Sequence, residues 1–138
     1  MMNLSASEST IRRVLIIAGL LGASGIIIGA FTAHGLRDWL IDRGFGDVVE
    51  KRVDQADVGV RYHLLHAVAL LALSAVSSAF PTRRYWIIVT LMTLGVLLFS
   101  GSLYLLVALN VPALGAITPL GGLAWIAAWI LLMFPRRS

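Results

Sequence analysis

The stretch from Tyr85 to Phe134 constrains the fold more than any other feature of the chain. Its fifty residues carry no ionisable side chain apart from tyrosines. A transmembrane helix needs roughly 20 apolar residues, so this stretch is far too long for one crossing and long enough for two. Asn110-Val111-Pro112 interrupts it. We therefore expect a tight hairpin of two spans, over 85–109 and 114–134.

The composition is that of a membrane protein throughout the chain. Hydrophobic residues make up 59%, charged residues only 13%, and the mean hydropathy is +0.89, whereas a soluble domain carries roughly 25% charged residues. Two further apolar runs, Val14–Ala33 and Leu64–Phe80, precede the hairpin and predict spans over 13–34 and 62–80. The expected fold is an all-α, integral membrane four-helix bundle that forms a single domain over 1–138.

The basic residues indicate membrane topology rather than nucleic-acid binding, despite a pI near 10.4. Three arginine pairs fall on the side that the two termini and the turn before the third span share: Arg12/Arg13, Arg83/Arg84 and Arg136/Arg137. Six of the seven acidic residues lie in the first loop, with five basic ones, so that loop is nearly neutral. The positive-inside rule then predicts cytoplasmic termini.

The first loop, 37–61, is more than a linker. Val49, Val53, Ala56 and Val60 recur at i, i+4, i+7 and i+11, which predicts an amphipathic helix that runs into the second span. The alternative is a solvated, charged helix that only spaces the two spans.

Small residues predict where the helices touch. In lipid, glycine lets two backbones approach closely, and Ala18, Gly22, Gly25, Gly29 and Thr32 are spaced 4, 3, 4 and 3 along the first span. The residues that we expect to serve helix packing are Gly22, Gly25, Gly29, Gly101, Gly121 and Gly122.

Polar side chains gather toward the expected outer ends of the spans. They either form a structural cluster of interhelical hydrogen bonds or line a pocket open to the outer side. The pocket residues would be His34, Tyr62, His63, His66, Ser100, Ser102, Tyr104 and Thr118.

Three of these residues are histidines and raise the question of a metal. His63 and His66 share one helical face, and His34 could complete a three-ligand site. No acid or cysteine joins them in the spans, however, and structural zinc takes four ligands. We therefore expect a polar cluster, with no metal and no other cofactor.

Several function classes are excluded by what the spans lack. Proton-coupled carriers generally need an intramembrane carboxylate, and no acidic residue falls within an expected span. No serine–histidine–acid arrangement, phosphate-binding glycine loop or flanking carboxylate pair is recognisable. We expect no enzyme.

Four motifs follow one another along the chain: Gly29–Leu36, Val60–Ala67, Phe99–Tyr104 and Ile117–Gly122. Together they resemble the YgdD-like family of small bacterial inner-membrane proteins of unknown function, which has relatives in mitochondria. The resemblance covers about residues 14 to 134, and it departs from the family pattern at Thr32, where glycine is usual, and at His63, where glutamine is usual. It implies four transmembrane helices in a bacterial inner membrane and no established activity.

Two functional hypotheses remain open. The first is a non-enzymatic interaction, accessory or assembly component that packs through its glycine face against a second copy or a larger membrane complex. The second is a small ligand-handling protein, whether a channel, a transporter, or a lipid or metal binder, that uses the outer polar pocket. We favour the first because no charged pathway crosses the spans. The expected surroundings are the lipid bilayer and membrane partners, without nucleic acid.

Overall fold

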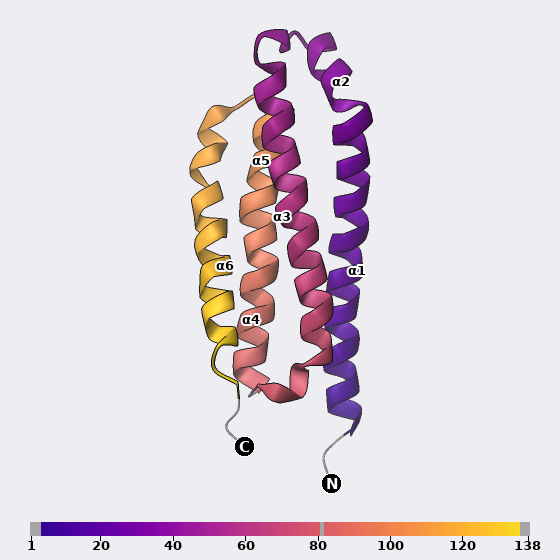
Figure 1. Cartoon of the computed structure of the whole chain (residues 1–138), viewed down its shortest axis with the longest axis vertical. Coiled ribbons are helices and arrows are strands. Elements are labelled where there is room, and N and C mark those ends of the chain that lie inside the picture. Colours follow the sequence, from indigo (N-terminus) through magenta and orange to yellow (C-terminus); the bar gives the residue numbers. More distant parts are fainter. Residues whose placement is uncertain (1–3, 81, 136–138) are drawn as a thin grey trace.

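The computed structural model describes residues 4–80 and 82–135, and every regular element in these ranges is helical (Figure 1). The expected all-α class is confirmed. In chain order the elements are α1 (Leu4–His34), α2 (Leu36–Asp42), η1 (Gly46–Val48), α3 (Val49–Ala75), η2 (Ser77–Ala79), α4 (Thr82–Gly95), η3 (Val96–Ser100), α5 (Gly101–Leu109), η4 (Pro112–Ala116) and α6 (Thr118–Leu132).

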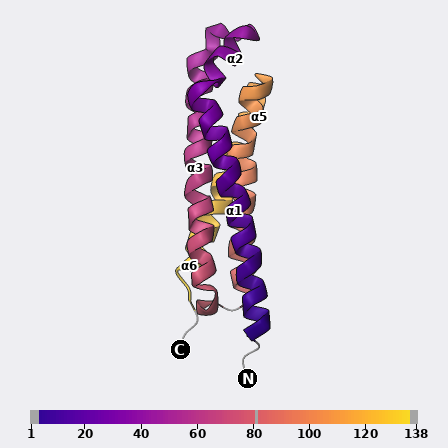
Figure 2. The ribbon, with the colours of Figure 1, turned by 90° about the vertical axis from the view of Figure 1, so that its right-hand side faces the viewer.

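Four helical rods of the described part are long and apolar enough to cross a membrane. They run up and down side by side, so that α1 begins and α6 ends at one pole (Figures 1 and 2). We call this the terminal pole and the opposite end, which carries α2, the loop pole. The rods are Glu8–His34, Gly46–Ala75, Thr82–Leu109 and Pro112–Leu132.

The second rod differs most from its expected bounds, 62–80. The amphipathic segment of the first loop and the apolar run form one helix, α3, which ends at Ala75. After it, η2 makes one tight turn and Phe80 is extended, with φ −123° and ψ 151°. Proline disfavours a helical conformation in the residue before it, and Pro81 follows Phe80 in the sequence. The span therefore gains residues at its start and loses them at its end.

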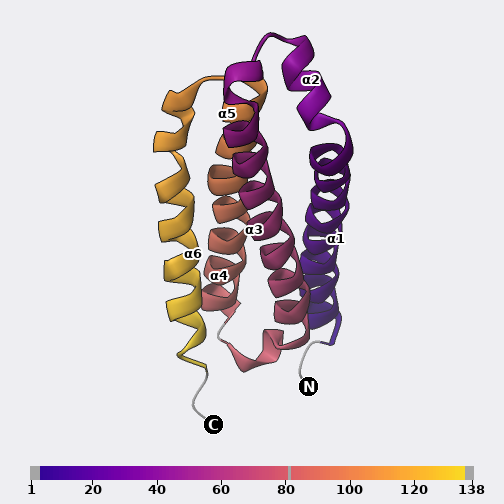
Figure 3. The same cartoon turned by 45° about the horizontal axis from the view of Figure 1, so that its top comes forward.

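α2 lies at the loop pole, above the end of α1 and in contact with α3 (Figure 3). Leu36 and Leu40, on its inner face, are 4% and 0% exposed. They belong to a small core with Val49, Ala56, Leu106 and Val107. α2 is thus held by the same burial of apolar surface that packs the long helices.

The larger core fills the half of the bundle nearer the terminal pole. It joins residues of α1, α3, α4, η3 and α6, among them Val14, Leu70, Ile88, Met92 and Trp125. The outer surface is also apolar, because leucine and isoleucine side chains project from all four rods. A bundle that is apolar inside and outside is expected in a bilayer.

The third rod contains a π-helical turn. The Gly101 N–H donates to the Val96 carbonyl and closes η3 between α4 and α5. Just before this turn Trp125 lies over Gly95, where an added Cβ would come within 2.2 Å of Trp125 Nε1. The indole N–H donates to the Met92 carbonyl at 3.1 Å. Gly95 therefore leaves the space in which the Trp125 ring lies.

A neighbouring pair of glycines tests how closely α6 packs. A Cβ at Gly121 would lie 2.4 Å from the Phe99 backbone nitrogen, whereas a Cβ at Gly122 would have no atom within 4 Å. We expect Gly121→Ala to lower the free energy of unfolding by about 1–3 kcal/mol, because rigid backbone cannot move aside. Gly122→Ala should leave stability unchanged or raise it by up to about 1 kcal/mol through helix propensity.

Thermal unfolding in a mild detergent, followed by circular dichroism, measures both variants. Equal melting temperatures for Gly121→Ala and Gly122→Ala would show that α6 does not approach the Phe99 backbone this closely.

Candidate functional site

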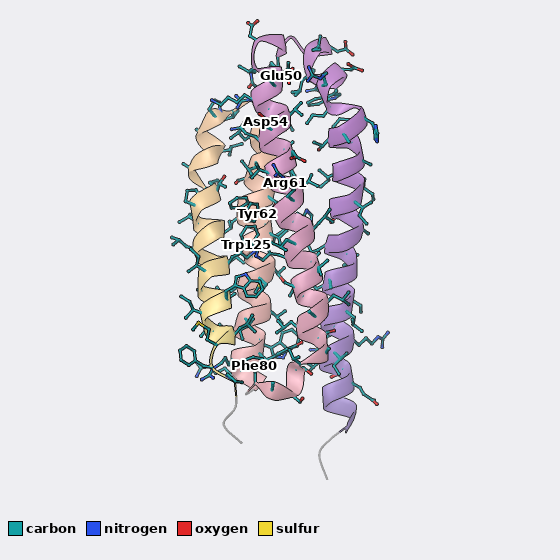
Figure 4. All side chains as sticks on the ribbon, viewed as in Figure 1. Glu50, Asp54, Arg61, Tyr62, Phe80 and Trp125 are labelled. Carbon is teal, nitrogen blue, oxygen red and sulfur yellow. The ribbon has the colours of Figure 1, made fainter. Side chains whose placement is uncertain are left out.

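Five rings meet near the middle of the bundle, where Figure 4 places Tyr62 and Trp125. His66 stacks on Trp125 with ring centroids 3.7 Å apart and planes within 4°. Phe99 packs on Trp125 at 4.8 Å, and Tyr62 on Trp125 at 5.7 Å. Trp129 meets the edge of His66 at 6.4 Å. We call these five residues the aromatic stack; it joins α3, η3 and α6.

The hydrogen bonds of His66 fix its tautomer. Nδ1 lies 2.8 Å from the Tyr62 carbonyl oxygen, which can only accept, so Nδ1 carries the proton. In the neutral ring Nε2 is then an acceptor, and the Trp129 indole nitrogen lies 3.5 Å from it. The ring is 2% exposed. His66 is therefore held on every side by its own chain.

Three further hydrogen bonds join polar residues of neighbouring helices. His63 Nδ1 lies 3.2 Å from the Tyr104 hydroxyl. The Ser100 hydroxyl donates to the Gly59 carbonyl at 2.8 Å and is fully buried. No buried side-chain nitrogen or oxygen in the described ranges lacks a partner. One further pair joins the hydroxyls of Ser102 and Thr118 at 2.8 Å.

The structure separates His34 from the other predicted pocket residues. Gly25 faces His63 and Leu64 across α1 and α3. His34 lies nine residues from Gly25 toward the loop pole, and His66 lies three residues from His63 in the opposite direction. At roughly 1.5 Å per residue they are about 18 Å apart along the bundle, and His34 is exposed.

Consequently the three histidines form no common site. No group of three or more His, Cys, Asp or Glu side chains suited to a metal occurs among the residues that the structure describes. Tyr62 and Trp125 of the aromatic stack also lie nearer the middle of the bundle than the outer pole expected for the polar residues (Figure 4).

Two of the predicted packing glycines lie in the contact between α1 and α3. A Cβ at Gly25 would meet Leu64 Cδ2 at 2.7 Å, and one at Gly29 would meet Val60 Cγ1 at 3.0 Å. Gly22 has no atom within 4 Å of its Cβ position, and the same is true of Gly122. At Gly101 the nearest atom is 4.0 Å away.

Sequence reasoning missed one buried cation, Arg52, which is 4% exposed. Its Nε and Nη2 donate to Asn110 Oδ1 at 2.8 and 2.6 Å, and Nη1 donates to Gln55 Oε1 at 2.8 Å. Asn110 has φ 52° and caps α5. The negative end of a helix dipole favours a nearby cation. Arg52 thus links α3 to the turn of the hairpin. Asparagine is one of the few residues other than glycine that tolerate the left-handed backbone conformation seen at Asn110.

A polar recess lies between α1 and α3 near the loop pole, with a volume of about 320 Å³. Asp57 pairs with Arg61 at 2.9 Å, and both side chains are more than half exposed. Arg37 binds Glu50 with both guanidinium nitrogens, and this hydrogen-bonded carboxylate raises the pKa of Arg37. We call the recess and its charged rim the charged seam; its residues are Gly29, Ala33, Arg37, Asp54, Asp57 and Arg61.

The charged seam reaches down beside apolar surface. Arg61 follows Arg52 by nine residues, which is about 14 Å along α3, and Figure 4 shows Arg61 well below the upper end of α6. On the other helices near this level Leu105 and Leu120 are 53% and 56% exposed. The outward face of α3 thus carries exposed charges at a depth where neighbouring helices expose leucine.

Comparison with known proteins places this arrangement in a family. Residues 28–122 match the family described as Protein of unknown function (DUF423). The chain belongs to the DUF423 family. It is 41% identical to UPF0382 membrane protein YwdK of Bacillus subtilis, over 88% of this chain and 94% of the relative.

A second relative, UPF0382 inner membrane protein YgdD of Escherichia coli, is 33% identical to this DUF423 chain over 90% of the chain and 88% of the relative. No solved structure matches the chain. The family resemblance and the membrane assignment are confirmed, and neither the family description nor these names assign an activity.

The bond from Ser100 to Gly59 gives a test of the polar pairs. Ser100→Ala should lower the free energy of unfolding by about 0.6–1.7 kcal/mol, the range for interhelical hydrogen bonds in membranes. Ser74→Ala is the matched control, because that buried hydroxyl donates to Leu71 within its own helix. Detergent unfolding titrations compare the two. A loss no larger for Ser100→Ala than for Ser74→Ala would contradict an interhelical role.

Proposed function

We propose that this DUF423 protein is a non-enzymatic interaction protein of the bacterial inner membrane that docks a partner transmembrane helix on the charged seam. The observation that carries the proposal is the exposure of Asp54, Asp57 and Arg61 beside apolar helix surfaces. Ionisable side chains at membrane depth almost always face protein or a water-filled cavity. A second polypeptide on the seam would cover these three.

The charges of the seam suggest what the partner carries. Arg37 is paired with Glu50 and Arg61 with Asp57, whereas Asp54 has no ion-pair partner in the described part of the chain. One negative charge is therefore left over. A partner helix with a lysine or arginine at the depth of Asp54 would compensate it.

The shape of the seam suits a helix as well. Gly29 and Ala33 of α1 line the recess beside Asp54 and Asp57. Small side chains allow a second helix to approach, as the glycine-rich face was expected to do. The aromatic stack, by contrast, is engaged with its own chain, which favours a structural role for it over catalysis.

The proposed orientation puts the terminal pole in the cytoplasm. Arg12 and Arg13 precede the apolar part of α1, and Arg83 and Arg84 begin α4 at the same pole. Basic residues of short loops favour the cytoplasmic side. The charged seam would then open toward the outer side.

Photo-crosslinking in native membranes tests the docking surface. A benzophenone amino acid at Ala33, on the seam, should give one adduct of defined mass. The same group at Ala30, an exposed α1 alanine outside the recess, should not. The adduct should fall roughly tenfold or more in Asp54→Lys, because like charges then oppose one another, and persist in Asp38→Lys.

Asp54 and Asp38 are both exposed, so neither reversal should unfold the chain. Equal adducts from Ala33 and Ala30, or an adduct that survives Asp54→Lys, would overturn the docking surface.

A second candidate function, a small ligand-handling protein, is favoured by a separate observation. An apolar cavity lies on the other side of α1, toward α5.

A further inference from the structure

The apolar cavity near the loop pole has a volume of about 260 Å³ and is lined by residues of four helices. Ile28 and Phe31 of α1 form one wall, and Tyr104 and Ala108 of α5 face them. Ala56 of α3 and Leu36 and Trp39 of α2 complete the lining. We call it the α1–α5 cavity.

The cavity is partly open, and α1 and α5 supply two of its walls. α1 packs along α3 and contacts α2, rather than packing along α5. Figure 2 shows α1 and α5 separating toward the loop pole, with α2 above them. In a bilayer such an opening faces the acyl region, while α2 shields it from water.

The lining is suited to hydrocarbon. Its polar side chains are Thr32, which is 9% exposed, and Tyr104, whose hydroxyl is engaged with His63 Nδ1 at 3.2 Å. An occupant would therefore find no unpaired buried donor or acceptor to bind, and a polar ligand would lose its own hydrogen bonds to water on entry.

A cation lies at the rim of the same cavity. The Arg43 guanidinium lies over the Trp39 ring, 4.3 Å from its centroid. Trp39 in turn meets Phe31 edge to face at 6.2 Å. Arg43 forms no salt bridge with a carboxylate within the described residues. Tryptophan is enriched at the level of lipid headgroups, so this pair sits where a phosphate group would be.

We propose that the α1–α5 cavity binds one acyl chain of an anionic phospholipid, whose phosphate group lies against Arg43. The inference does not depend on the docking surface, since the charged seam lies on the other side of α1. It combines an apolar, laterally open cavity with a cation at its headgroup end, and this combination matches the two parts of a phospholipid.

Native mass spectrometry of the full chain tests the proposal. The protein is released from detergent containing equal amounts of phosphatidylglycerol and phosphatidylcholine with identical acyl chains. We expect one retained phosphatidylglycerol, with a preference of about fivefold over phosphatidylcholine from one arginine near the phosphate.

Two pairs of variants test separately the binding of the acyl chain and the binding of the headgroup. Ala108→Trp fills the cavity and should abolish retention, whereas Ala72→Trp, at an exposed alanine of α3, should not. Arg43→Gln should abolish the preference for phosphatidylglycerol. Arg83→Gln should leave it unchanged, because Arg83 lies beside Trp86 in a shallow recess at the terminal pole.

Each result supports or overturns the proposal. Equal retention of the two lipids by the unaltered chain, or retention by Ala108→Trp at the level of Ala72→Trp, overturns it. A retained polypeptide in place of lipid, lost in Ala108→Trp, would assign the cavity to a partner helix and also overturn it. Because Arg43 is exposed, Arg43→Gln keeps the test decisive even if Ala108→Trp fails to fold.

Discussion

Polar groups in a bilayer must find partners inside the protein, and several contacts between these helices follow from that constraint. Ser100 donates across to the Gly59 carbonyl, Trp125 donates to the Met92 carbonyl, and Trp129 of α6 donates to His66 Nε2 of α3. Each of these bonds requires two helices to lie close together. Glycines at the crossings, such as Gly95 and Gly121, make that approach possible.

Among the long helices, α1 packs mainly against α3. Gly25 and Gly29 lie in this contact between α1 and α3, and a recess borders α1 on each side of it. One flank borders the charged seam and the other the α1–α5 cavity. Thr32 lines both recesses, so the last turns of α1 form a wall between a polar and an apolar site.

Much of the fold could be predicted because its signals are local. The uncharged run ending at Phe134 and its interruption at Asn110 define the hairpin, and the spacing from Val49 to Val60 defines the start of α3. The depth of the polar residues could not be predicted in this way. The second span was expected to begin at 62, whereas α3 begins at Val49, so His63 and His66 lie mid-helix rather than at the outer end.

The glycine spacing predicted part of the contact between α1 and α3, but specific side-chain pairings between helices could not be predicted. Arg52 looked like one more charge of a solvated loop, and only its position opposite Asn110 makes it a buried clamp. Trp125 lies over Gly95 because of the register between α6 and α4. Such pairings depend on the axial register between two helices. Hydrophobic periodicity along one helix does not determine that register.

The charges on the outward face of α3 differ in how well they can escape the bilayer. Arginine has a long stem that lets its guanidinium reach toward water, and the Arg61 head group points back one turn to Asp57. Aspartate has no such stem. Asp57 is neutralised by Arg61, but Asp54 has no cation beside it in the described part of the chain and lies next to Gly29 and Ala33. Among the charges on this face, Asp54 is the one that a bare bilayer would disfavour most, and so it is where a bound partner would gain most.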